Sequence, residues 1–224
     1  MPDTAVLGRF AGDLPLCSVG STGLMVFFCS GILTGLGGGV NVLAAICVGQ
    51  KNYKDFEVTV RASAVACFCI GILLLVAGIF SATGILKLLN TKPELLHDAV
   101  VYFKIYMLCM PAMAMYNFGN AILSAQGDTR SPLLYLIAAG IVNVFLDLLL
   151  VIVFKLSVIG VGVATVIAQY ISCILTLRKI YKVLSKNNFD FKYRQISSYK
   201  ILQIIKIGVP AGLQNAIFAI ANLF

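Results

Sequence analysis

The chain has 224 residues, of which 60% are hydrophobic and only 12% are charged, and its mean hydropathy is +0.97. A water-soluble domain carries about 25% charged residues, so this composition excludes an ordinary soluble protein and favours a lipid bilayer as the solvent. The net charge of +8 does not indicate nucleic-acid binding, because the excess lies between apolar segments and no nucleic-acid-binding motif is present.

Apolar runs separated by short charged segments predict membrane-spanning helices along the whole chain. Residues 1–10 fit the trailing end of a span whose beginning is absent. No charged residue occurs between Asp13 and Lys51, which predicts one long, bent span over about 17–47. The cluster Gly35–Gly39 can either bend this helix or let a neighbouring helix approach closely. Further spans are predicted over residues 62–86, 105–125, 132–154, about 158–177 and 201–224.

The connecting segments predict where helices end and how the chain is oriented. In the sharpest turn, Gly127 can end one helix, Ser131 can cap the next, and Pro132 suits a first helical position. When the loops are assigned alternately to two sides, most of the loop lysines and arginines fall on one side. The positive-inside rule therefore places this side in the cytoplasm. Its loops are residues 51–61, 126–131 and 178–206.

Asp147 is an acidic residue in the middle of the predicted span 132–154, with leucines on both sides. A carboxylate at the bilayer centre costs about 3 kcal/mol on insertion scales, so it has to face protein or water and needs partners. Asn143 lies four residues earlier on the same helical face, where its amide can help to bind a cation or can donate to the carboxylate. The two residues therefore indicate a proton or cation site, with a structural hydrogen-bonded Asp as the alternative.

Other polar residues inside the predicted spans leave two interpretations open. Asn117 and Thr165 are each either interhelical hydrogen-bonding residues or part of a site, and Gln169 shares a helical face with Thr165. The methionines around Pro111 indicate either ordinary packing or an apolar cavity for varied ligands. The sequence contains no catalytic cluster, so an enzyme is not predicted.

Five motifs, in this order, resemble the multidrug and toxic compound extrusion (MATE) family, and they span essentially the whole chain. The resemblance is closest to the DinF-like or MepA-like branch of that family. The motifs are Asp3–Arg9 (end of helix 1), Gln126–Pro132 (loop between helices 4 and 5), Asn143–Asp147 (helix 5), Gly160–Gln169 (start of helix 6) and Ile207–Gln214 (start of helix 7).

The resemblance implies an all-α polytopic membrane fold of twelve helices, arranged as two six-helix lobes related by a pseudo-twofold axis. This chain would supply one lobe of a MATE-type transporter of the MOP superfamily, incomplete at both ends. Residues 1–186 would form the N-terminal lobe, from the end of helix 1 to helix 6. Residues 187–200 would be the cytoplasmic linker between the lobes, and residues 201–224 the start of the C-terminal lobe, helix 7, with the rest of that lobe missing.

The resemblance also implies a cation or proton site in the N-terminal lobe. Carried over by motif, it consists of Asp3, Asn117, Asn143, Asp147 and Thr165, and all five match the family in residue type. Sodium would be held by Asp3, Asn143, Asp147 and Thr165. A substrate cavity is assigned to Tyr116, Met113, Gln169 and Gln214. The glutamate that another branch carries on helix 7 has no counterpart here, because Gln214, Asn215 and Phe218 occupy that region.

The function expected from this resemblance is multidrug efflux across the cell inner (plasma) membrane by H⁺-coupled or Na⁺-coupled antiport, with the chain as a fragment. The partners would be small, often cationic, organic drugs, the lipid bilayer and the missing C-terminal lobe, with no cofactor beyond the coupling ion. One alternative is a flippase for lipid-linked oligosaccharides, although its expected basic cavity conflicts with spans that carry almost no Arg or Lys. The other is an inactive truncated half-transporter.

Overall fold

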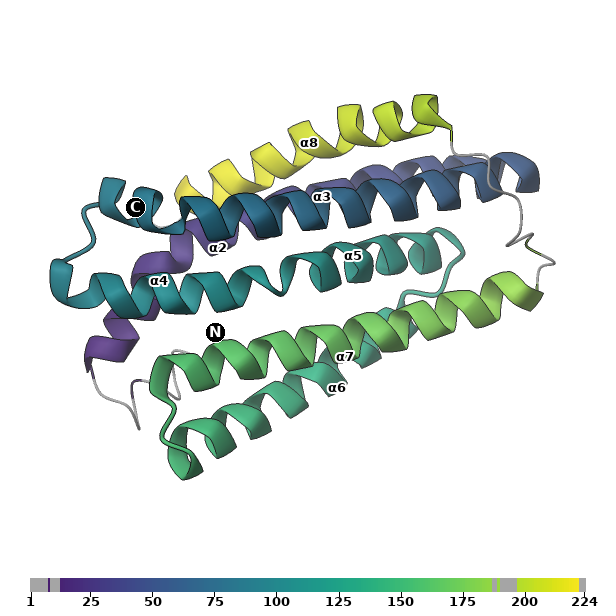
Figure 1. Ribbon diagram of the computed structural model, residues 1–224. Helices are drawn as coiled ribbons and strands as arrows, with labels where there is room; N and C mark the ends of the chain where they lie inside the picture. The colour runs from purple at the N-terminus through teal and green to yellow at the C-terminus, as the bar shows by residue number, and fades with distance from the viewer. Residues whose placement is uncertain (1–7, 9–12, 187–188, 190–196, 222–224) are drawn as a thin grey trace.

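The computed structural model describes residues 8, 13–186, 189 and 197–221, and these residues form an all-helical bundle without strands (Figure 1). A π-helical segment, η1 (Leu149–Val153), directly continues the helix before it. The α-helices are α2 (Asp13–Gly49), α3 (Tyr53–Leu88), α4 (Pro93–Met107), α5 (Met110–Ala125), α6 (Arg130–Leu148), α7 (Ser157–Lys186) and α8 (Ser198–Ala221).

The helices run roughly along one axis in a layered order (Figure 1). Helix α8 packs on α2 and α3, helices α6 and α7 pack on each other at the opposite side, and α4 and α5 lie between the two groups. The central helices supply the largest buried side chains, including Phe103, Met107, Met110 and Leu123. Because α6 has only one face against the bundle, most of its apolar residues are exposed on the outside, as a lipid-facing helix requires.

The spans predicted from residue 17 onward are confirmed as helices over the described residues, but their ends are not at the predicted residues. The span end predicted over residues 1–10 lies, apart from residue 8, outside the described residues. Four described helices are long and apolar enough to cross a membrane, and a fifth span results if α4 and α5 are counted as one bent pair. Helix α3 begins at Tyr53 rather than near residue 62, because Asn52 caps it by accepting a hydrogen bond from the Asp55 backbone N–H. Helix α7 continues to Lys186 beyond the predicted end near residue 177. Long helices can extend past the bilayer, where charged residues are tolerated.

The predicted span 105–125 is a bent pair of helices that already begins at Pro93, because the chain breaks within it. Helices α4 and α5 meet at Leu108–Cys109 with a bend of 42°. Pro111 is the cause: it lacks a backbone N–H, and its ring would clash with the carbonyl of Met107 in a continuous helix. It stands instead in the first turn of α5, where a missing N–H costs nothing.

The turn between α5 and α6 follows only part of the predicted pattern. Gly127 ends α5 with a left-handed φ of 88°, as predicted. The predictions for Ser131 and Pro132 are wrong, because α6 already begins at Arg130. The carboxylate of Asp128 supplies the interaction expected of Ser131: it accepts hydrogen bonds from the Ser131 backbone N–H (3.0 Å) and hydroxyl (2.7 Å).

The glycine cluster of α2 serves close approach between helices. A Cβ atom on Gly35 would collide with the backbone of Gly212 in α8 and lie 2.6 Å from the carbonyl oxygen of Gly208. A Cβ atom on Gly39 would lie 3.0 Å from the Gly208 nitrogen. Each helix thus presents two glycines four residues apart, the spacing that lets helix backbones touch in membranes.

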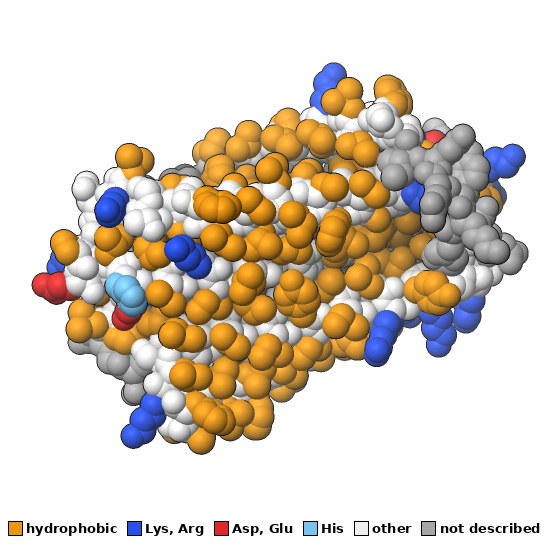
Figure 2. All heavy atoms as spheres, viewed as in Figure 1, with side chains coloured by type: hydrophobic (Ala, Val, Ile, Leu, Met, Phe, Trp, Pro, Cys, Tyr) orange, Lys and Arg blue, Asp and Glu red, His pale blue; other side chains and the backbone are white. Residues whose placement is uncertain are grey.

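The surface is divided in the way that a membrane protein requires. Hydrophobic side chains cover the middle of the face shown in Figure 2, and charged side chains gather toward the two ends of the bundle. One end carries the α2–α3, α5–α6 and α7–α8 connections, and the opposite end carries the α3–α4 and α6–α7 connections (Figure 1). The loops predicted to share the cytoplasmic side therefore do lie together at one end.

Candidate functional site

The buried face of α6 carries both polar residues that the sequence singled out. The residues of α6 that are buried are Pro132, Ala139, Asn143 and Asp147, whose spacing of seven, four and four places them on one helical face. Asn143 is 7% exposed and Asp147 is 0% exposed. The leucines around Asp147 lie on the other faces, so the helix directs its carboxylate into the protein and its apolar surface outward.

Asn143 and Thr165 join α6 to α7 in the interior of the bundle. The Asn143 side-chain nitrogen donates to the Thr165 hydroxyl over 3.3 Å, and that hydroxyl donates to the Val161 carbonyl over 3.0 Å. Thr165 thus receives one hydrogen bond across the interface and makes one within its own helix. The contact is an interhelical hydrogen bond, which is one of the two roles left open for Thr165, and a role of either residue in a site stays a prediction. A carboxyl, an amide and a hydroxyl group therefore lie on two adjoining helices.

A π-helical segment begins two residues after Asp147, and the sequence did not predict it. In η1, Phe154 donates its backbone N–H to the Leu149 carbonyl (3.3 Å), which is the i→i+5 pattern of a π-helix. A Cβ atom on Gly160 would lie 3.1 Å from the Leu150 Cβ, so the start of α7 packs closely on this segment. Short π-helical turns occur frequently at functional sites. The run of leucine, valine and isoleucine gives no local signal for it.

The remaining predicted site residues lie elsewhere or outside the described residues. Asp3 is outside the described residues. Asn117 lies on α5 against α2, where a Cβ on Gly37 would approach the Asn117 Cβ to 3.2 Å. Its side-chain nitrogen is buried and has no hydrogen-bond partner among the described residues. The structure therefore joins Asn143 to Thr165 and buries Asp147 on the same face of α6 as Asn143, and the site roles of all five residues stay predictions.

The four residues assigned to a substrate cavity are in different surroundings. Tyr116 is buried, and its hydroxyl donates to the Pro132 carbonyl over 3.2 Å. Met113 packs partly buried against the main core. Gln169 is half-buried on α7, whereas Gln214 is exposed on α8. Their assignment to a cavity stays a prediction.

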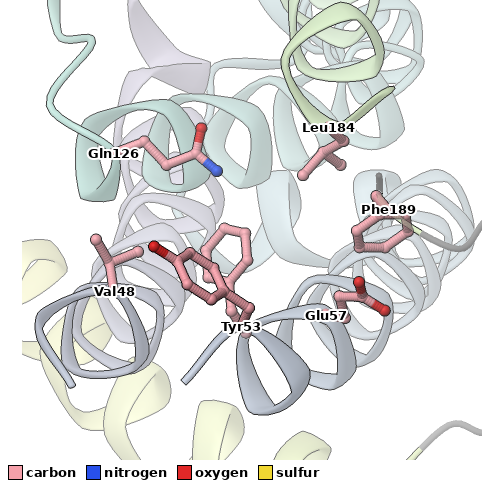
Figure 3. Close-up of a pocket in the computed structure, with 7 residues that line it drawn as sticks. Val48, Tyr53, Glu57, Gln126, Leu184 and Phe189 are labelled. Carbon is pink, nitrogen blue, oxygen red and sulfur yellow. The ribbon is translucent and has the colours of Figure 1, made fainter. Parts of the chain in front are cut away.

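A pocket of about 240 Å³ opens at the end of the bundle that is predicted to face the cytoplasm (Figure 3). Among the described residues, Glu57 is the one acidic residue that lines it, and its carboxylate already accepts a hydrogen bond from Arg61 at 3.0 Å. The Arg61 guanidinium also lies 4.8 Å from the ring centre of Phe189, which follows α7. The described lining of this pocket is therefore largely apolar and aromatic, with its one carboxylate paired to Arg61. Its lining residues are Val48, Tyr53, Phe56, Glu57, Gln126, Leu184 and Phe189.

The Asn143–Asp147–Thr165 group has the chemistry predicted for a site that takes a small hard cation or a proton. Oxygen atoms of carboxylate, amide and hydroxyl groups are the ligands that hard cations prefer. No group of three His, Cys, Asp or Glu side chains that could hold a metal occurs within the described part of the chain, and Asp147 is the carboxylate that this part contributes to the predicted site.

Comparison with known proteins agrees with this architecture. The family model MatE matches residues 1–149. The chain belongs to the MATE family. It is therefore a multi-pass membrane protein, as the spans and the lipid-facing surface of α6 also indicate.

Three curated relatives match nearly the whole chain with about a quarter of the residues identical. The chain is similar to YoeA of Bacillus subtilis, named a probable multidrug resistance protein (25% identity; 97% of this chain, 48% of the relative). It is also similar to the multidrug export protein MepA of Staphylococcus saprophyticus (23%; 96% and 48%) and to an FAD transporter of Shewanella oneidensis (27%; 99% and 50%). The chain thus spans about half the length of these relatives.

The same half-length match holds for a solved structure. The fold superposes with a TM-score of 0.90 on the outward-facing conformation of a multidrug resistance MATE family transporter of the MOP superfamily. The alignment covers 99% of this chain and 49% of that one, with 19% sequence identity. The all-α fold predicted for one half of a MATE transporter is confirmed.

Proposed function

We propose that this chain provides the first lobe of a multidrug exporter that is driven by inward movement of H⁺ or Na⁺. The buried carboxylate of Asp147, next to the Asn143–Thr165 hydrogen bond, is the single observation that supports this proposal most strongly. Intramembrane acidic residues are costly, and they commonly mark ion pathways. The multidrug names of YoeA and MepA support the substrate class, whereas the FAD transporter is the reason to test it directly.

The proposed mechanism uses one buried negative charge as the element that couples ion to drug. When Asp147 is charged, the polar group on α6 and α7 favours one packing of the helices; when Asp147 is protonated or holds Na⁺, it favours another. Drug export then requires only that the ion and the drug have different affinities for the two conformations. Asp3 and Asn117 would complete the site, and residues 201–224 would begin the second lobe.

Ethidium efflux in bacteria that lack their own drug pumps tests this function. The 224-residue chain is compared with the reading frame extended to the length of its relatives, and Asp147→Asn is introduced into whichever version exports. We expect Asp147→Asn to abolish efflux that depends on the ion gradient, because the amide cannot change its charge. Asp98→Asn is the matched control, because Asp98 is an exposed acidic residue on α4.

Two results would contradict the proposal in different ways. Full gradient-driven efflux by Asp147→Asn would show that coupling does not pass through this carboxylate. No efflux by either version would favour the alternatives, a flippase for lipid-linked oligosaccharides or an inactive half-transporter. Transfer of a fluorescent lipid-linked sugar across reconstituted vesicles would identify the flippase.

A further inference from the structure

One ion pair connects α8 to the rest of the bundle at the predicted cytoplasmic end. The Lys200 ammonium group, in the first turn of α8, donates to the Asp55 carboxylate on α3 over 2.7 Å. The Lys200 side chain is 15% exposed, so water does not fully surround the pair. The two residues are 145 positions apart in the sequence, so the contact exists only because α8 is docked on this bundle.

The Asp55 carboxylate receives contacts from two other helices at the same time. The Cys47 thiol, near the end of α2, donates to the same carboxylate oxygen over 3.3 Å. Asn52, between α2 and α3, accepts from the Asp55 backbone N–H over 3.2 Å and so fixes the first turn of α3. Three helices, α2, α3 and α8, therefore meet at a single carboxylate.

Besides the ion pair to α3, α8 packs on α2 with a buried side chain, Ile204, and with backbone that approaches closely at the glycines. Ile204 lies one turn after Lys200 and is fully buried, and its carbonyl oxygen would lie 3.0 Å from a Cβ on Gly39. One turn further, a Cβ on Gly208 would lie 2.8 Å from the Leu36 Cα. Dispersion attraction of this kind falls steeply once a gap opens, so the contact is strong only while the helices touch.

We propose that Asp55 and Lys200 form an ionic latch that keeps α8 against α2 and α3 and closes the cytoplasmic end of the α2–α8 interface. The inference rests on the proposed transporter function, in which α8 begins the second lobe and the two lobes separate at each end in turn. An ion pair at the edge of the interface suits this role, because water can replace both partners when it opens. The ion pair would keep α8 close enough for the glycine contacts between α2 and α8 to form.

The latch is tested by measuring how fast a buried cysteine next to it reacts with a maleimide. Ile204→Cys is introduced into a background in which the exposed Cys17 and Cys69 are replaced by Ala. Open membrane fragments are used, so the reagent reaches both sides and the result depends on neither orientation nor transport. The native Cys173, buried on α7, is the internal reference for general loosening of the fold.

Removing the charge on one partner should open this interface and leave the rest of the bundle unchanged. We expect Asp55→Asn or Lys200→Gln to raise the labelling rate at position 204 about fivefold or more, and to leave the Cys173 rate as it was. Lys200→Arg, which keeps the charge, and the exchange Asp55→Lys with Lys200→Asp should restore slow labelling. Lys206→Gln removes an exposed positive charge from the same helix and should have no effect.

The outcomes separate a latch from ordinary stabilisation and from failure of the transport proposal. Equal labelling of position 204 in Asp55→Asn and in the parent would overturn the latch, and so would parallel acceleration at Cys173. If the variant with the exchanged pair does not fold, Lys200→Arg provides the test instead. Fast labelling of position 204 in Lys200→Arg would also overturn the proposal. A latch that behaves as expected in a chain whose extended form exports no dye would leave the latch supported and the exporter function rejected.

Discussion

The two outer interfaces of the bundle, α2–α8 and α6–α7, are held together by different kinds of contact in the middle of the membrane. Between α2 and α8, glycines remove side chains so that backbones touch. Between α6 and α7, a polar group is kept inside an apolar wall by the Asn143–Thr165 hydrogen bond. In lipid there is little hydrophobic force between helices, so association depends on close packing and on interhelical hydrogen bonds. The first interface depends on shape, and the second depends on polarity and lies beside the buried carboxyl group of Asp147.

If the α2–α8 interface depends on shape, a side chain at its centre should have the largest effect. Gly35→Leu should lower the stability of the packed protein by more than about 3 kcal/mol, because the new side chain meets backbone that cannot rotate away. Gly38→Leu, on the same helix, is the control, since a Cβ there meets nothing within 4 Å. The measurement is the thermal unfolding midpoint in detergent. Equal losses for the two variants would mean that α8 does not dock at Gly35.

If the α6–α7 interface depends on polarity, removing one hydroxyl group should have a moderate effect. Thr165→Val keeps the shape of the side chain and removes both hydrogen bonds of its hydroxyl, which should cost about 1 kcal/mol. Thr34→Val is the control, because the exposed Thr34 hydroxyl donates to the Ser30 carbonyl of its own helix and, among the described residues, makes no hydrogen bond across an interface. The same unfolding assay distinguishes them, and an equal change in both would show that the Asn143–Thr165 bond contributes nothing.

The sequence predicted the α6–α7 interface better than the α2–α8 interface, for a physical reason. Asn143 and Asp147 are four residues apart, so their common helical face follows from helix geometry alone. The partnership with Thr165 required the family resemblance, because nothing local specifies which residue lies across an interface. For Gly35–Gly39, bending and close approach stayed open, since only the position of α8 decides between them.

Two backbone irregularities were missed because each depends on where a helix begins or how it is packed. Pro111 breaks a helix in the middle but suits a first turn, so its effect depends on the start of α5. The π-helical segment after Asp147 lies in an uninterrupted apolar run, and it becomes visible only with the backbone hydrogen bonds. The composition of a span therefore predicts that it is helical, but it does not predict how that helix is interrupted.

The ion pair of Asp128, which lies outside both interfaces, is expected to contribute least to stability. It tests how much an exposed charge stabilises this protein. The Asp128 carboxylate accepts hydrogen bonds from the Ser131 backbone and hydroxyl and pairs with Lys179 on α7 at 3.2 Å. These contacts, with those from Ser131 first, hold the pKa of Asp128 below its ordinary value. About a third of each side chain of the ion pair is exposed, so Asp128→Asn should cost only about 0.5 kcal/mol at pH 7.

The pH dependence of that difference has a definite sign. Because the folded-state pKa of Asp128 is lowered, its stabilisation is complete above the ordinary pKa of 3.8 and is lost as the pH falls through the folded value. The gap in unfolding midpoint between the parent chain and Asp128→Asn should therefore stay constant from pH 7 to about 5 and then shrink. A gap that persisted under strongly acidic conditions would mean that the amide disturbs the turn at Gly127 sterically. A difference in unfolding midpoint that shrinks would show that Asp128 stabilises the protein through its charge. This charge lies where water and salt weaken its interactions, whereas the carboxyl group of Asp147 is fully buried.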